Sequence, residues 1–229
     1  MQKYAFKLHD NIPPGYYLDS IKRNPFQRFW HLRRFKNVGE LIPEVKGAVL
    51  DIGSSDGTFT EIIAEKSKAD EVVGIDIVKS SVDYARRRFC NTKKFNFMVA
   101  DGEFLPFEKN SFSAVFCLEA LEHVVNPKRA VCEMNRVLCK GGYLIVLVPT
   151  DSLLFRTIWW VVLRTWGKHW KETHVNSFNN KNPIGDFIKK QGFHIEVDKK
   201  FLHGMLEVVR AKKLQSAYAE FPESRDLVI

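Results

Sequence analysis

Apolar and polar residues are arranged along the chain in blocks that predict short strands separated by helices. Apolar runs of strand length occur at residues 48–52, 71–77, 95–100, 113–118 and 143–148. Helical patterns separate several of them, at residues 59–66, about 81–88 and 127–138. Strands that alternate with helices in this way pack as a parallel sheet with helices on both faces. We therefore predict a doubly wound α/β fold.

An aromatic and basic helix is expected before the first strand. Asn24 fits the N-cap position and Pro25 the first helical position, and the pattern runs to about Leu41. The positions that we expect to be buried are Phe26, Phe29, Trp30, Phe35 and Val38. The basic residues of this helix then form a solvated face, a lid over a ligand, or a contact with an anionic partner. Residues 1–23 are expected to be irregular.

The chain after residue 148 divides into an interruption, a closing unit and a tail. Two closing strands, at residues 193–199 and 205–211, lie close in sequence with Gly204 between them, so we expect them to pair antiparallel. A length of 229 residues suits one domain with additions. Its expected parts are a leading segment (1–44), a core (45–148), a helical insertion (149–182), closing elements (183–211) and a polar tail (212–229).

The turn after the first strand carries the most informative chemistry. Gly53 and Gly57 can adopt backbone angles that residues with a Cβ avoid, and they let a ligand approach the main chain closely. Carboxylates at Asp51 and Asp56 would repel the phosphates that often bind at a helix N-terminus. The turn therefore favours a nucleoside cofactor that is positively charged and has no phosphate.

Acidic residues recur at the ends of the following strands. Asp76 lies about 20 residues beyond the glycine turn, where a doubly wound fold places the carboxylate that receives ribose hydroxyls. Asp101 and Gly102 end the third run, and Glu119 follows the fourth. Because the carboxyl ends of parallel strands meet at one edge of a sheet, we expect these residues to face a common crevice.

These segments, in this order, resemble the motifs of the class I S-adenosylmethionine-dependent methyltransferases, in the branch that holds quinone-biosynthesis and other small-molecule enzymes. The resemblance covers residues 45–148. The stretches that carry it are VLDIGSSDG (49–57), GIDI (74–77), ADG (100–102), LPF (105–107) with FSAV (112–115), LEALEHV (118–124) and RVLCKGG (136–142). Ser55 departs from a commoner glycine, Ser113 from an aspartate and Lys140 from a proline; the serine at 55 is small enough to be tolerated.

The resemblance implies a Rossmann-like, seven-stranded, mostly parallel sheet whose last strand inserts antiparallel. It implies S-adenosyl-L-methionine as the cofactor and S-adenosyl-L-homocysteine as the product. By position in the motifs, the residues expected to bind the cofactor are Asp51, Gly53, Ser54, Ser55 and Gly57 at its methionine part, Asp76 and Ile77 at the ribose, Asp101 and Gly102 at the adenine, and Glu119 along its length. Arg34 is a candidate for the cofactor's carboxylate.

Methyl transfer from a sulfonium is an in-line displacement, so the protein mainly supplies proximity and alignment. A base is needed only when the acceptor must lose a proton. The two candidate catalytic bases are His123, just beyond the fourth strand, and His174, in the turn at 172–174. A packing or capping role remains the alternative for each.

The methyl acceptor is expected to be decided by residues 149–180. Apolar side chains fall at helical spacing on one face, namely Phe155, Trp159, Val162, Leu163, Trp166 and Trp170. Basic side chains lie largely on another, namely Arg156, Arg164, Lys168 and Lys171. This pattern fits a lid over the acceptor pocket. It also fits an interfacial helix over 155–171 on an anionic membrane, with a lipid or quinone precursor as acceptor, or an RNA-facing surface.

Composition limits which partners, metal sites and cellular locations we expect. The chain has 35 basic and 27 acidic residues, a net charge of +8, which suits RNA, an anionic membrane surface, acidic substrates, or solubility alone. Four cysteines form no CxxC pair and no metal-ligand spacing, so we expect reduced core thiols and no metal. Residues 1–10 contain no apolar signal-peptide region. A cytoplasmic protein is expected, with peripheral membrane contact as an alternative.

Several competing functions can be weighed from the residues. The position of the Asn/Asp-Pro-Pro-aromatic motif of adenine-N6 enzymes reads EALE at 119–122, and no Pro-Cys pair of a cytosine-C5 enzyme occurs. The preferred acceptor is small and lipophilic, and an RNA or protein methyltransferase is the alternative. A nicotinamide-dependent oxidoreductase lacks its full G-x-G-x-x-G turn here. A non-catalytic scaffold that keeps the fold is disfavoured by the complete acid set Asp51, Asp76 and Asp101.

Overall fold

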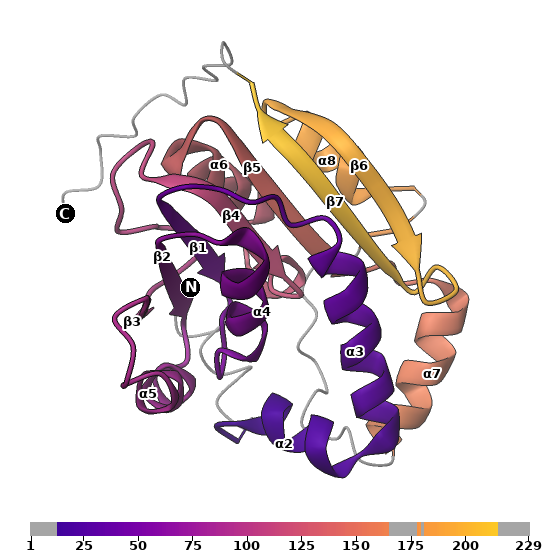
Figure 1. The fold of residues 1–229 in the computed structure, drawn as a ribbon. Helices are drawn as coiled ribbons and strands as arrows, with labels where there is room; N and C mark the ends of the chain where they lie inside the picture. The colour runs from indigo at the N-terminus through magenta and orange to yellow at the C-terminus, as the bar shows by residue number, and fades with distance from the viewer. Residues whose placement is uncertain (1–12, 165–177, 180, 215–229) are drawn as a thin grey trace, which may run out of the picture.

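The protein is built on one seven-stranded sheet with strand order β3-β2-β1-β4-β5-β7-β6, seen in a computed structural model that describes residues 13–164, 178–179 and 181–214 (Figure 1). The strands are β1 (Ala48–Ile52), β2 (Glu71–Asp76), β3 (Phe95–Val99), β4 (Phe112–Leu118), β5 (Leu138–Pro149), β6 (Phe193–Phe201) and β7 (Leu206–Lys213). The helices are α2 (Tyr16–Arg23), α3 (Pro25–Gly39), α4 (Thr58–Ser67), α5 (Lys79–Arg88), the 3₁₀ turn η1 (Leu121–His123), α6 (Pro127–Val137), α7 (Leu153–Arg164) and α8 (Ile184–Lys189).

Strands β1 to β5 pair in parallel, and β7 lies antiparallel between β5 and β6. The short connection at 202–204 explains this insertion. Leu202, His203 and Gly204 all have positive φ, so β6 and β7 form a tight hairpin that cannot cross over the sheet. The predicted doubly wound fold with one antiparallel inserted strand is confirmed.

Apolar layers cover both faces of the sheet, because successive strand residues point to opposite sides. Leu50 packs in a cluster with Met134 of α6 and Ile188 of α8. Its neighbour Val49 packs in a second cluster with Val38 of α3 and Ile63 of α4. In Figure 1, α3 and α4 accordingly lie on one face, and α6 and α8 on the other.

The leading segment differs from the sequence prediction in two ways. Residues 16–23, expected to be irregular, form helix α2. Helix α3 begins as predicted, with the Asn24 side chain accepting from the backbone N–H groups of Phe26 and Gln27. However, its buried residues are His31, Arg34 and Val38, whereas Phe26 is 43% exposed and Phe29 is 50% exposed. Val38 packs in the apolar layer and Arg34 forms an ion pair with Glu119. The rotation of the helix that allows both contacts leaves Phe26 and Phe29 facing outward.

Smaller corrections concern element ends. Helix α5 begins at Lys79, with Val78 at its N-cap position, about two residues before the predicted start. Strand β5 begins five residues before the predicted strand at 143–148, because Gly141 and Gly142 lie within it as an irregularity of register against β4. Strand β7 continues to Lys213, two residues into the predicted tail, because those residues still pair with β5 and β6.

The helical insertion is described only in part. Helix α7 covers residues 153–164, while Trp166, Lys168, Trp170, Lys171 and His174 lie outside the described residues. Among the helices that the structure describes, none is long and apolar enough to cross a bilayer. Of the four free cysteines, Cys117 is buried but Cys90 is exposed, so the expectation of core thiols is wrong for Cys90, which follows α5 at the molecular surface.

Candidate active site

A cavity of about 370 Å³ lies where the carboxyl ends of β1, β2, β3 and β4 meet. Parallel strands bring their ends together at this edge, so residues distant in sequence share one wall. The residues singled out from the sequence that line it are Gly53, Ser55, Asp76, Ile77, Asp101, Gly102, Glu119 and His123. Tyr17, Phe104 and Arg129 line it as well.

The glycine turn forms the floor of the cavity and needs its glycine. Gly53 has φ of +79°, and a Cβ added there would lie 2.5 Å from the Cβ of Ala120. The N–H groups of Gly53 and Ser54 donate to the carbonyl of Ile75, which ties the turn to β2. Ser55 has φ of +47°, a conformation that glycine adopts without cost. Serine therefore strains the backbone where the family usually has glycine.

Asp76 joins the turn to the end of β2. Its Oδ2 accepts from the Ser55 N–H at 2.9 Å and its Oδ1 from the Val78 N–H at 2.8 Å. Burial raises the pKa of this carboxyl, and the backbone hydrogen bonds oppose that rise. Each carboxylate oxygen has a second lone pair, so both remain able to accept from ligand hydroxyls in the cavity.

Three other predicted residues support the turn from behind and do not line the cavity. Asp51 is buried and its Oδ2 accepts from Thr60 Oγ1 at 2.6 Å; burial raises its pKa to about 7. Ser54 is buried next to Gly74. Gly57, with φ of +77°, is the N-cap of α4 and packs against the ring of Phe89. The structure brings them near the cavity without exposing them to it.

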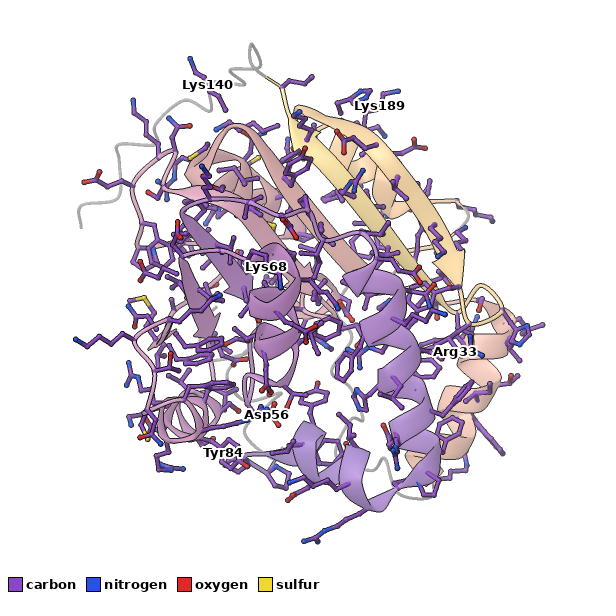
Figure 2. The ribbon with its side chains drawn as sticks, in the orientation of Figure 1. Arg33, Asp56, Lys68, Tyr84, Lys140 and Lys189 are labelled. Atoms are coloured by element: carbon purple, nitrogen blue, oxygen red, sulfur yellow. The ribbon has the colours of Figure 1, made fainter. Side chains whose placement is uncertain are left out.

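Asp56, the second acid of the turn, secures the leading helices. Its Oδ1 accepts from the Thr58 N–H at 3.0 Å, and its Oδ2 from the Leu18 N–H of α2 at 3.2 Å. Asp56 is 1% exposed and lies next to α2 in Figure 2. Its carboxylate is therefore used to hold α2 over the turn.

The far wall is a loop whose shape is set by its own polar contacts. Asp101 Oδ1 accepts from the Glu103 N–H, and Glu103 Oε1 accepts from the N–H groups of Val125 at 2.8 Å and Asn126 at 2.9 Å. Phe104 is 55% exposed and carries the Arg129 guanidinium 4.9 Å from its ring centroid. This loop is thereby joined to the start of α6.

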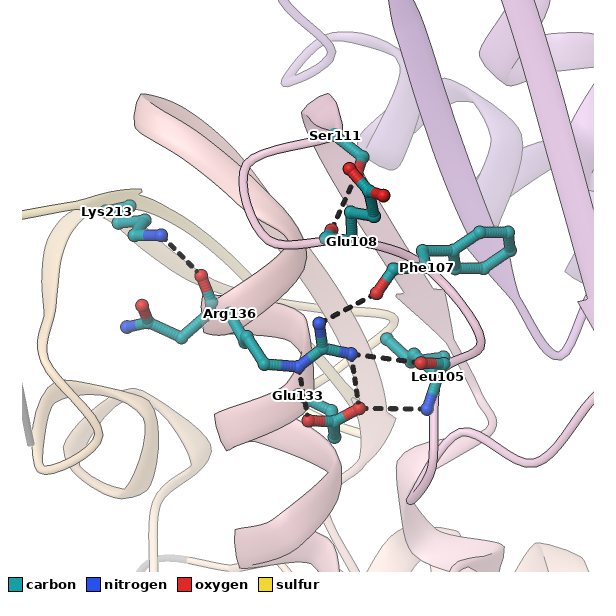
Figure 3. A network of polar contacts seen from close by, with 8 residues as sticks. Leu105, Phe107, Glu108, Ser111, Glu133, Arg136 and Lys213 are labelled. Carbon is teal, nitrogen blue, oxygen red and sulfur yellow. Dashed lines mark hydrogen bonds and ion pairs between the residues drawn. The ribbon is translucent and has the colours of Figure 1, made fainter. Parts of the chain in front are cut away.

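The same loop is held farther along by the Arg136 network shown in Figure 3. The Arg136 guanidinium donates to the carbonyls of Leu105 and Phe107 and to both carboxylate oxygens of Glu133. Glu133 Oε2 also accepts from the Leu105 N–H. These contacts join the LPF stretch (105–107) to the RVL stretch (136–138), and together they hold the loop that forms the far wall of the cavity.

Helices α2 and α3 cover the cavity with a buried polar cluster. Arg34 is 5% exposed, forms an ion pair with Glu119, and donates from Nη1 to His31 Nδ1 at 3.0 Å. Because arginine can only donate, His31 accepts and is neutral, and burial with the Arg34 charge lowers its pKa to about 2. Burial lowers the pKa of Arg34 to about 10. The Tyr17 ring meets His31 edge-on at 5.5 Å.

Glu119 is held in an unusual backbone conformation at the end of β4. Its φ is +55°, its N–H donates to the Leu147 carbonyl at 2.8 Å, and its side chain pairs with Arg34. Strain of this kind persists only where surrounding contacts impose it, and it is common at functional sites. His123, in η1, lies at the same wall with its Nε2 3.9 Å from Glu122 Oε1.

Sequence reasoning missed several lining residues, among them Tyr17, Phe104 and Arg129. Tyr17 comes from α2, whose helix was not expected, and its place over the cavity follows from the Asp56–Leu18 contact. Phe104 and Arg129 lie outside the family motifs, although the aromatic ring beside the Asp101-Gly102 turn was a readable signal. Within the described ranges, no cluster of three or more His, Cys, Asp or Glu side chains is arranged to hold a metal ion.

Comparison with known proteins gives one consistent answer. Residues 50–146 match the model of the methyltransferase domain family Methyltransf_11. A demethylmenaquinone methyltransferase of Thermotoga maritima is 25% identical over 217 residues, which cover 87% of this chain and 92% of the relative. One from Renibacterium salmoninarum is 31% identical over 156 residues, which cover 66% and 62%.

Solved structures agree at the level of the fold. A structure described as an S-adenosylmethionine-dependent methyltransferase, possibly a histamine N-methyltransferase, of Thermotoga maritima is 22% identical, has a TM-score of 0.67 and covers 91% of this chain and 99% of its own. A geranyl diphosphate methyltransferase is 11% identical with a TM-score of 0.70 over 93% and 99%. Together with the sheet order and the acid-lined cavity, the methyltransferase domain at residues 50–146 and these similarities support a class I S-adenosylmethionine-dependent methyltransferase.

Proposed function

We propose that this enzyme transfers a methyl group from S-adenosylmethionine to a small, lipophilic acceptor by in-line displacement. The observation that carries the cofactor assignment is the charge of the cavity. Asp76, Asp101, Glu103 and Glu119 line it, against Arg129 in the wall and Arg34 paired behind Glu119. Four carboxylates against two guanidinium groups leave a negative excess, which favours a cationic ligand and disfavours a pyrophosphate.

The residues present fit that cofactor along the whole cavity. Asp76 would receive the ribose hydroxyls, with Ile77 beside the sugar. Asp101 and Gly102 would contact the adenine ring at the far wall. Backbone groups of Gly53 and Ser55, with Glu119, would hold the methionine part. We propose that Asp51, Ser54 and Gly57 act by keeping the turn in shape, since they lie behind the cavity wall.

When bound, S-adenosylmethionine supplies an electrophilic methyl group on its sulfonium. The chain then has to orient the acceptor and exclude water, and Tyr17 of α2 covers the cavity for this purpose. Arg34 acts as a positioning residue, because it fixes the carboxylate of Glu119 through their ion pair. His123 at the wall would take a proton from an acceptor that must lose one. His174, the second proposed base, lies outside the described residues.

A lipophilic acceptor is supported by the relatives, which are named for methylation of demethylmenaquinone. Helix α7 follows the carboxyl end of β5 and leaves Leu153, Leu154 and Trp160 exposed. The Arg164 guanidinium lies 3.8 Å from the Trp160 ring centroid. Exposed apolar and aromatic groups beside cations suit the proposed contact of residues 155–171 with an anionic membrane surface, although Phe155 itself is 7% exposed and packs inward.

The acceptor class can be tested by incubating the enzyme with methyl-labelled S-adenosylmethionine and cell extract, followed by separation of lipid, RNA, protein and small polar molecules. We expect label in the lipid fraction with the wild type and none above background with Asp76→Ala. Asp83→Ala, an acid-to-alanine change on α5 outside the cavity, serves as the matched control. Label that enters RNA or protein instead, and depends equally on Asp76, would contradict the lipophilic acceptor and support the alternative.

A further inference from the structure

The outward face of α3 exposes three large apolar side chains on successive turns. Phe26 is 43%, Phe29 50% and Leu32 51% exposed. Their spacing of three residues places them along one side of the helix. A single exposed phenylalanine needs no explanation, but a row of three on one helix forms a contiguous apolar stripe.

The orientation of α3 is not the one that hydrophobicity alone would select. The helix buries His31 at 3% and Arg34 at 5% exposure while these apolar residues face solvent. Removing a guanidinium from water is costly unless it is paired, and here the ion pair with Glu119 fixes the rotation. The inner face thus serves the cavity, whereas Phe29 and Leu32 on the outer face are about half exposed.

The charges around the stripe indicate that the partner carries negative charge. Exposed cations flank it at Lys22, Arg23, Arg28, Arg33 and Lys36. Within the described residues none of these five forms an ion pair, and Asp19 is the sole acid between Tyr16 and Gly39. The Arg33 guanidinium lies 5.3 Å from the Phe29 ring centroid, and Figure 2 shows Arg33 on the side of α3 away from α4.

We infer that this outward face of α3 docks the enzyme on an anionic lipid bilayer, with Phe26, Phe29 and Leu32 entering the headgroup region and the surrounding cations contacting lipid phosphates. Helices that lie in a bilayer interface combine an apolar stripe with Lys and Arg at its margins. An acidic protein or an RNA would match the charge, but neither requires three inserted apolar side chains.

The inference rests on the proposed function, because docking here serves a lipophilic acceptor. The same helix carries the surface contact on one face and the Arg34–Glu119 ion pair on the other. Glu119 lines the cavity, so the docked face and the cofactor site are one helix diameter apart. Docking through this face would therefore hold the cofactor site close to the bilayer from which a lipophilic acceptor is drawn.

The test is flotation of the full chain with phosphatidylcholine vesicles that contain or lack phosphatidylglycerol, at low and high salt. We expect binding only to the anionic vesicles and weakening by salt. Phe29→Ser with Leu32→Ser should lower the partition coefficient roughly a hundredfold, since each of the two apolar side chains contributes about a factor of ten when it is buried. Arg28→Gln with Arg33→Gln should lower it and remove much of the salt dependence. Val99→Ser, an apolar residue 46% exposed on β3, is the control and should float as the wild type does.

Binding of S-adenosylhomocysteine to each variant separates this inference from the proposed function. Unchanged affinity with lost flotation supports docking through α3. Flotation that survives both α3 double variants, or no flotation of the wild type at low salt, overturns it. Retention on immobilised RNA that is lost with the arginine variant, without flotation, would also overturn it. A wild type that floats yet binds no S-adenosylhomocysteine would refute the proposed function and leave the docking surface standing.

Discussion

The carboxylates of this site have different roles at each position. Asp76 accepts two backbone N–H groups and still faces the cavity, so it both shapes the glycine turn and offers lone pairs to a ligand. Asp56 accepts hydrogen bonds from two backbone N–H groups and does not line the cavity. Asp51 accepts from Thr60 Oγ1, and burial raises its pKa to about 7 against the opposing effect of that hydrogen bond. The identity of the residue alone therefore does not assign its role.

Replacement of Asp76 tests the ribose role at this scale. Asp76→Ala should weaken S-adenosylhomocysteine binding by roughly 1–3 kcal/mol, because hydroxyl donors in the cavity lose their acceptor. Titration calorimetry measures this directly. Asp76→Asn keeps one oxygen acceptor and should fall between the wild type and alanine.

Two further measurements serve as controls for the affinity of Asp76→Ala. Asp83→Ala on α5 should bind as the wild type does, since Asp83 pairs with Lys79 and Arg86 outside the cavity. Thermal unfolding of Asp76→Ala without ligand should show how much the Ser55 and Val78 contacts stabilise the fold. Unchanged affinity in Asp76→Ala would remove this residue from the cofactor site.

At the scale of elements, α3 is a helix whose orientation is set by polar contacts. Its inner face holds a neutral His31 that accepts from Arg34, with Tyr17 and Phe35 against the imidazole ring. Protonation of His31 would place a second positive charge beside Arg34. The arrangement is therefore stable only while the imidazole stays neutral.

The neutral state of His31 makes the unfolding free energy of the protein depend on pH, and the direction of that dependence follows from the pKa of His31. The pKa of His31 is about 2 in the folded state and about 6.5 when unfolded, so the unfolded chain binds more protons between these values. Stability from this group is complete above about pH 6.5 and is lost progressively as the pH falls below it. His31→Gln can still accept from Arg34 without titrating, so its unfolding free energy should fall less than that of the wild type between pH 7.5 and 5.

Urea unfolding at several pH values measures the difference between the two proteins, and the other histidines cancel in it. Limited proteolysis at the same pH values should show cleavage near α2 and α3 rising in the wild type before it rises in His31→Gln. Parallel pH curves for the two proteins would contradict the neutral, buried role of His31.

The whole molecule is a sheet whose carboxyl edge is lined with acids and covered by α2 and α3. Four different strands contribute to this edge, so a ligand that binds there joins parts of the chain that are otherwise linked only through the sheet. A ligand that binds the native state and not the unfolded state stabilises a protein by mass action.

S-adenosylhomocysteine at about 100 times its dissociation constant should therefore raise the free energy of unfolding by roughly 2.7 kcal/mol. For a chain of this length that corresponds to a rise of about 5–10 °C in Tm. Differential scanning fluorimetry should show this shift with S-adenosylhomocysteine and none with NADH, because the negative cavity disfavours a pyrophosphate. A shift with NADH alone would contradict the proposed cofactor site.

The sequence by itself determined the order of strands and helices from α3 onward and the place of the glycine turn. These follow from local patterns: β-type runs, capping residues such as Asn24, and the motifs from 49 to 142. The acids at the ends of β2, β3 and β4 were also readable, because a parallel sheet brings strand ends together whatever the details of packing.

Tertiary structure alone decided which side of each element faces the cavity. Asp51, Ser54 and Gly57 share the motif of Gly53 and Ser55, yet the backbone turn places the first three behind the wall and the other two on it. Helix α3 has aromatic residues that a pattern would bury, but the ion pair of Arg34 with Glu119, 85 positions away along the chain, rotates them outward. Such a choice depends on a partner that is distant in sequence, and hydrophobic periodicity within one helix contains no information about it.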